Sequence, residues 1–104
     1  MQEIKNVEHY FSDGLYCKMM IIADGSEVVS HKHNYDHLSV LAKGCAIVEV
    51  DDEQYTFYAP SIINIKKGKR HSVRPVNGDA VWLCIHATDE TDADKIDEVL
   101  IQHA

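Results

Sequence analysis

Residues 25–44 read GSEVVSHKHNYDHLSVLAKG, and this stretch decides how the rest of the chain is interpreted. It contains His31, His33 and His37, and a fourth histidine, His71, follows in a later segment. In an extended strand the side chains of His31 and His33 project from the same face, so both rings can reach one ion. Imidazole is the commonest protein ligand for transition metals. The four histidines therefore predict a metal site.

Short apolar or alternating segments recur along the chain, separated by turn formers such as Asp24-Gly25, Lys43-Gly44 and Asn77-Gly78. Many short strands at even spacing predict an all-β sandwich or barrel. The segments expected to form strands are residues 15–23, 27–33, 38–42, 45–50, 54–58, 62–65, 71–74 and 80–87.

The chain is expected to be a single domain over residues 1–104, with a barrel core at about 15–87. The tail, residues 88–104, has a different character. Residues 91–94 resemble a helix N-cap, and Ile96, Val99 and Leu100 follow at helical spacing. These features predict a short C-terminal helix that packs on the barrel.

Strand alternation predicts which histidines face inward. Val29, His31 and His33 share one face of their strand, and His71 shares a face with Val73. Because each of these faces also carries valine, we expect both to be the inner face of the barrel. A buried imidazole needs a polar partner, and a metal ion bound by several rings would meet that need.

Charge and composition exclude several classes of function. The formal net charge of −7 argues against a nucleic-acid partner, which normally requires a basic surface. The one basic cluster, residues 66–70, is interpreted as a solvated turn, or alternatively as an anchor for an anionic substrate beside His71. The first ten residues lack a secretory signal, and the longest apolar run, residues 80–85, is too short to span a membrane. We therefore expect a cytoplasmic protein with no membrane partner.

The cysteines indicate the same compartment. Cys17, Cys45 and Cys84 are odd in number, form no C-x-x-C pair and lie in apolar contexts. They are predicted to be buried thiols in a reducing environment, without a disulfide framework.

Residues 25–44 resemble the first motif of the cupin family, which runs Gly, five residues, His-x-His, three or four residues, Glu, six residues, Gly. Every spacing is met, and His37 stands where the motif has glutamate. Residues 60–75 resemble the second motif, Gly, five residues, Pro-x-Gly, two residues, His, three residues, Asn. Only Gly68 and His71 of that motif are kept, because Pro60, Lys66 and Pro75 replace the others.

This resemblance implies a small cupin-type double-stranded β-helix, or jelly-roll barrel, that holds one metal ion. His31, His33 and His71 match the three histidine ligands, and His37 matches the carboxylate ligand. His37 could instead lie beside a three-histidine site without ligating. Four neutral imidazoles leave the ion its full charge and disfavour calcium and magnesium. Iron(II) or manganese(II) is favoured, and nickel, copper and zinc suit the same donors.

The resemblance leaves two kinds of function open. The first is a metal-dependent enzyme, dioxygenase-like, that acts on a small chelating organic substrate; a non-oxidative isomerase, cyclase or lyase would use the same site. The second is a non-catalytic module that binds or senses a metal or small ligand. The resemblance also suggests a homodimer, in which Leu38 and Val40 on the face opposite His37, or residues before Leu15, contact a second copy. His9, His86 and His103 lack a matched partner in either motif.

Overall fold

The computed structural model describes residues 4–29, 36–92 and 94–95. Nine strands follow one another along the chain: β1 (Ile4–Ser12), β2 (Leu15–Ile22), β3 (Val28–Val29), β4 (His37–Lys43), β5 (Cys45–Val50), β6 (Glu53–Tyr58), β7 (Ser61–Ile65), β8 (His71–Pro75) and β9 (Ala80–Ala87). Within the described ranges there is no α-helix, and no helical segment is long and apolar enough to cross a membrane.

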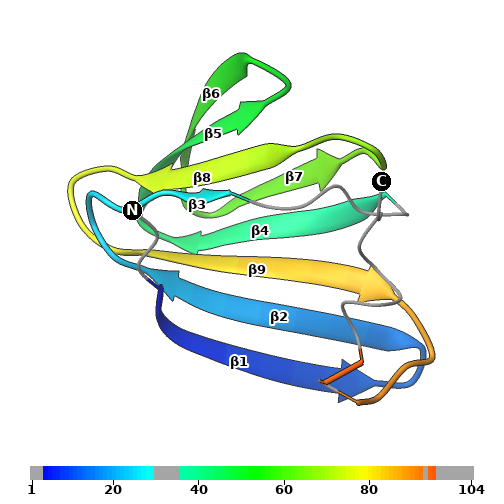
Figure 1. Cartoon of the computed structure of the whole chain (residues 1–104). Helices are drawn as coiled ribbons and strands as arrows, with labels where there is room; N and C mark the ends of the chain where they lie inside the picture. Colours follow the sequence, from blue (N-terminus) through cyan, green and yellow to red (C-terminus); the bar gives the residue numbers. More distant parts are fainter. Residues whose placement is uncertain (1–3, 30–35, 93, 96–104) are drawn as a thin grey trace.

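The strands form two antiparallel sheets that face one another (Figure 1). The five-stranded sheet has the order β1-β2-β9-β4-β7, and the four-stranded sheet has the order β3-β8-β5-β6. Sequence neighbours such as β4 and β5 lie in different sheets, so the chain winds between the two layers. This is the double-layered antiparallel arrangement that alternating strands need in order to bury one face each.

The apolar core fills the space between the sheets at one end of the sandwich. Trp82 of β9 is fully buried, and Leu41 of β4 and Val48 of β5 approach it from the two layers. The remaining buried members of this cluster are Met20, Ile22, Ala46, Val73, Ala80 and Cys84. Their alternation with exposed neighbours is the pattern that predicted the strands.

The predicted all-β fold is confirmed, and seven of the eight predicted strands agree within two residues at each end. The exception is the segment 27–33, of which the described part forms only the two-residue β3. The predicted C-terminal helix lies outside the described residues. At its expected start, the backbone amide of Asp94 donates to Oδ1 of Asp92 at 2.9 Å, as an Asx turn does.

Strand β1 was not predicted. It pairs with β2 along its length, from Ile4↔Ile22 to Ser12↔Leu15. The residues before Leu15 were expected to contact a second copy; within this chain they extend the five-stranded sheet. Val7 and Tyr10 lie on opposite faces of β1, and both are exposed. The apolar residues of this segment therefore do not mark one buried face.

Candidate metal centre

Two of the predicted ligands, His37 and His71, lie side by side between the sheets. His37 begins β4 in the five-stranded sheet, and His71 begins β8 in the four-stranded sheet. Each residue is only 4% exposed, and their ring centres are 5.7 Å apart with the planes tilted by 46°. The fold thus brings together two imidazoles from distant parts of the sequence.

Strand pairing explains why both rings face inward. His37 pairs with Ile65 of β7, and His71 pairs with Val50 of β5. Directly paired residues of antiparallel strands share a face, and Ile65 is 2% exposed. The predicted alternation in β8 is confirmed, because His71 and Val73 are buried while Arg74 is exposed.

A third histidine, His86, belongs to this group although the sequence motifs gave it no role. It lies on β9, is 4% exposed and stacks on His37, with ring centres 4.5 Å apart and 26° between planes. The signal that could have found it is the alternation along β9. Ala80, Trp82 and Cys84 are buried, and His86 continues the same face.

Tyr16 of β2 extends the row of rings toward the edge of the sheet. It is 2% exposed, and its ring centre lies 6.0 Å from that of His86. Its hydroxyl is 2.6 Å from Nδ1 of His9 on β1, within hydrogen-bonding distance. Rings from four adjacent strands therefore line one end of the inner face, from His37 outward to His9.

The two ends of the interior differ in polarity. The next inward-facing position along β4 and β9 is occupied by Ser39 and Cys84. The Ser39 Oγ lies 3.8 Å from the Cys84 Sγ. The position after that carries Leu41 and Trp82, which are fully buried in the core. The barrel thus has an apolar interior at one end and imidazole, hydroxyl and thiol groups at the other.

The other two predicted ligands, His31 and His33, lie outside the described residues. The alternation predicted for their segment is wrong in the part that the structure describes. Val28, which was assigned to the outer face, pairs with the buried Val73 and packs on the core. Val29, which was assigned to the inner face, is 45% exposed. The register of β3 is set by its pairing with β8 and not by the alternation of its own residues.

The spacing of the two described histidines permits one shared metal ion. A metal ion lies about 2.1 Å from an imidazole nitrogen and roughly 1 Å farther from the ring centre, so two rings on one ion have centres within about 6.5 Å. His37 and His71 meet this limit at 5.7 Å, and both nitrogens of His37 and Nδ1 of His71 are shielded from solvent. Among the described residues, no group of three His, Cys, Asp or Glu side chains is close enough to share an ion.

The stacked arrangement gives His86 a different role from that of a ligand. Donor lone pairs lie in the ring plane, so two nearly parallel stacked rings direct them side by side and not toward a common point. At 26° between planes, His86 covers a face of His37 and restricts the rotation of that ring.

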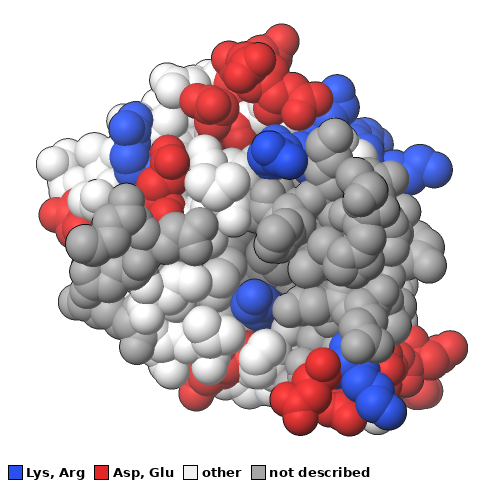
Figure 2. Space-filling view, viewed as in Figure 1, with Lys and Arg blue, Asp and Glu red and all other residues white. Residues whose placement is uncertain are grey.

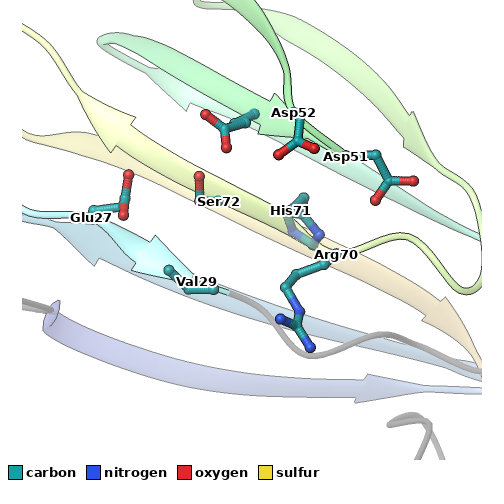
Figure 3. Close-up of a pocket in the computed structure, with 8 residues that line it drawn as sticks. Glu27, Val29, Asp51, Asp52, Arg70, His71 and Ser72 are labelled. Carbon is teal, nitrogen blue, oxygen red and sulfur yellow. The ribbon is translucent and has the colours of Figure 1, made fainter.

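A pocket of about 410 Å³ lies against the outer face of the four-stranded sheet (Figure 3). Its wall includes Ser72, which pairs with Val29 and Glu49, so these three share the face opposite Val73. Glu27, Asp51, Asp52, Arg70 and His71 complete the lining. His71 belongs both to this pocket and to the buried group of histidines, whereas Ser72, Val29 and Glu49 face outward.

Two of the four basic side chains before His71 form ion pairs with carboxylates. Lys66 Nζ lies 3.5 Å from Asp36 Oδ2, and Lys69 Nζ lies 2.9 Å from Asp51 Oδ2. Lys66 and Lys69 are about half exposed or more, so the interpretation as a solvated turn agrees with the structure. The thiols are free, as predicted, although only Cys84 is buried and Cys17 and Cys45 are partly exposed.

Comparison with solved structures identifies the fold. A cupin family protein from Methanocaldococcus jannaschii with a double-stranded β-helix superposes with a TM-score of 0.70 over 85% of this chain and 89% of its own, at 13% identity. KdgF from Halomonas sp. superposes with a TM-score of 0.71 over 86% of this chain and 89% of its own, at 10% sequence identity. The cupin domain of an XRE family transcriptional regulator from Enterobacter cloacae superposes with a TM-score of 0.70 over 82% of this chain and 97% of its own, at 17% sequence identity. The chain has the cupin fold.

Sequence comparison adds one relative and no family model matches. The relative is 5-nitrosalicylic acid 1,2-dioxygenase from Bradyrhizobium sp., 31% identical over 74 residues. The match covers 70% of this chain but only 36% of that enzyme, so the cupin chain spans about a third of its length. The cupin fold predicted from the two histidine motifs is thus confirmed by structure and accompanied by a distant dioxygenase relative.

Proposed function

We propose that this cupin binds one divalent transition-metal ion through His31, His33, His37 and His71 and oxidises a small chelating organic molecule. The observation that carries the proposal is the burial of His37 and His71 side by side, each 4% exposed, on facing sheets. Imidazole is the commonest protein ligand for transition metals, and two rings whose centres are 5.7 Å apart can bind one ion. Iron(II) or manganese(II) is the expected ion.

The distant dioxygenase relative supports oxidation of an aromatic acid. That enzyme is named for a nitro-substituted salicylic acid, a molecule whose phenol and carboxylate lie on neighbouring carbons. Such a pair of oxygens chelates a metal, and four neutral imidazoles leave the ion with the full charge that attracts it. Substituted phenols and hydroxy acids are therefore the proposed substrate class.

The residues of the chain have three tasks in this proposal. The four imidazoles would hold the ion, which would supply Lewis-acid and redox chemistry toward the substrate oxygens. His86 stacks on His37 and limits its rotation, so that the ligand is oriented before metal arrives. Ile65 and Val50, paired with the two histidines, keep the inner wall apolar and exclude water.

Elemental analysis of protein purified without added metal tests the metal site. We expect close to one equivalent of a transition metal in the wild type, and loss of that metal in His71→Ala. His37→Ala should weaken metal binding less, because the site can retain three histidines. His103→Ala is the matched control, since neither motif assigns it a role. Equal metal content in all four proteins would contradict the proposal.

Oxygen uptake tests the reaction. Metal-loaded protein is incubated with a panel of salicylates, catechols and diketones in an oxygen electrode, with the His71→Ala variant as control. We expect uptake with at least one member of the panel, and none with the variant. A metal-loaded protein that consumes no oxygen with any member would contradict the oxygenase proposal.

A second candidate is a non-catalytic ligand-binding module. It is favoured by the similarity to a cupin domain that belongs to a transcriptional regulator. A protein of this kind would bind the same chelating acids without consuming oxygen or changing them. Calorimetric binding together with unchanged ligand after overnight incubation would favour the module over the enzyme.

We also propose that the protein is a homodimer. The outer face of the five-stranded sheet exposes Leu38 and Ile62, at 45% and 72%, and Val40 pairs with Ile62 on that face. Apolar side chains of this exposure on one sheet face are typical of an interface between copies. Light scattering after size-exclusion chromatography should give twice the chain mass, and a mass near 11.8 kDa would contradict the proposal.

A further inference from the structure

A lysine lies on the inner face of the five-stranded sheet, one position from the row of rings. Lys18 stands between the buried residues Tyr16 and Met20 in the alternation of β2. It pairs with Cys84 of β9 on one side and with His9 of β1 on the other. Paired residues share a face, so Lys18 belongs to the inner wall.

No acidic side chain accompanies Lys18 on this wall. Inward-facing residues that pair directly across the five-stranded sheet form rows. The row at the candidate metal centre is Phe11, Tyr16, His86, His37 and Ile65, and the next row is His9, Lys18, Cys84, Ser39 and Ile63. The chain has 17 Asp and Glu residues, yet none stands in these rows. Over the residues that can be described, no carboxylate forms an ion pair with Lys18.

The surface view agrees with this distribution of charge. In Figure 2 a small blue group lies near the middle of the view, and most of the red atoms lie toward the rim. A positive group kept apart from the abundant carboxylates is suited to an anion that arrives from solution.

His9 adds a donor beside the lysine. It pairs directly with Lys18, and its Nδ1 lies 2.6 Å from the Tyr16 hydroxyl. When that hydroxyl donates to Nδ1, the neutral ring carries its proton on Nε2 and can donate from there. Lys18 and the exposed His9 thus place an ammonium and an imidazole N–H at directly paired positions of neighbouring strands.

We propose that Lys18 and His9 form a subsite for the carboxylate of a small organic acid whose chelating end is held at the histidine centre. The inference rests on the proposed function and specifies its substrate as an acid with a carboxylate remote from the chelating oxygens. Lys18 lies two strands and one inward-facing position from His37, about 12 Å at a strand spacing of about 4.8 Å and a rise of about 3.4 Å per residue. An extended lysine side chain and one aromatic ring together bridge that distance.

Two matched ligands test the subsite by calorimetry under anaerobic conditions. The ligand 3,4-dihydroxybenzoate carries a chelating pair of hydroxyls and a remote carboxylate, and 4-methylcatechol carries the same hydroxyls with a neutral methyl group instead. In Lys18→Met we expect affinity for the benzoate to fall about tenfold or more, as for loss of a charge-assisted hydrogen bond. Affinity for 4-methylcatechol should change less than about twofold, and Lys18→Arg should retain most of the preference for the acid.

Controls separate this inference from the metal proposal. Lys43→Met removes the same charge from an exposed position on β4 and should leave both affinities unchanged. Metal content is measured in every protein by elemental analysis and should not depend on Lys18. Equal weakening of both ligands in Lys18→Met, or weakening of neither, would overturn the subsite while the metal centre stands. A wild type that holds no metal and binds neither ligand would overturn both.

Discussion

Gly44 provides a quantitative test of how the turn that closes the first histidine motif is built. Its φ is +95°, and a Cβ placed there would lie 2.7 Å from the Asp79 carbonyl oxygen and 3.3 Å from Ala80 Cα. Both atoms are backbone at the start of β9, so a rotamer change cannot relieve the contact. Gly44→Ala therefore forces either the β4–β5 turn or β9 to shift.

The cost has two parts. An L-residue at positive φ loses about 1–2 kcal/mol, and forcing extra atoms into packed structure typically costs about 1–3 kcal/mol. We expect Gly44→Ala to lower the free energy of unfolding by about 2–5 kcal/mol. Gly14→Ala is the matched control, because Gly14 has φ +70° but no atom within 4 Å of the added Cβ. Gly14→Ala should lower the free energy of unfolding only by the cost of an L-residue at positive φ, about 1–2 kcal/mol.

Guanidinium unfolding of the three proteins, analysed by linear extrapolation, measures both changes. The expected difference between the two variants is about 1–3 kcal/mol, which is the cost of the contact alone. If Gly44→Ala and Gly14→Ala agree within about 0.5 kcal/mol, the close approach to β9 has no energetic consequence and the reasoning is refuted.

Two further predictions concern the interior thiol and the β5–β6 turn. Burial raises the pKa of Cys84 above its ordinary value of 9.0, so the unfolded chain releases this proton first. The raised pKa of Cys84 contributes fully to the free energy of unfolding below pH 9.0. This contribution falls by about 1.4 kcal/mol per pH unit as the pH rises from 9.0 to the pKa of the folded state. Urea unfolding of the wild type and Cys84→Ala between pH 8 and 10 should diverge accordingly, and parallel curves would disprove the linkage. Asp52 has φ +70° in a two-residue turn, so Asp52→Gly should stabilise the protein by about 1 kcal/mol, measured as a raised denaturation midpoint. Asp89→Gly, in a loop without positive φ, should give no gain, and an equal gain there would exclude the turn explanation.

The sequence alone determined most of the strands, and it predicts a metal site. Turn residues and apolar alternation located β2 and β4 through β9, because both signals are local and each strand buries one face. The spacing of the histidines indicated the cupin fold, since motif residues occupy fixed positions on that barrel. Gly44 could be assigned from the motif, although its reason, the approach to Asp79, is not visible in the sequence.

Tertiary structure decided which residues share the interior. The stacking of His86 on His37 and the position of Lys18 beside His9 depend on strand order, because β1, β2, β9 and β4 become neighbours only after the sheet forms. The facing of Val28 and not Val29 toward the core likewise follows from pairing with β8. Alternation along one strand gives two faces, and only contact with the neighbouring strand determines which of the two is buried.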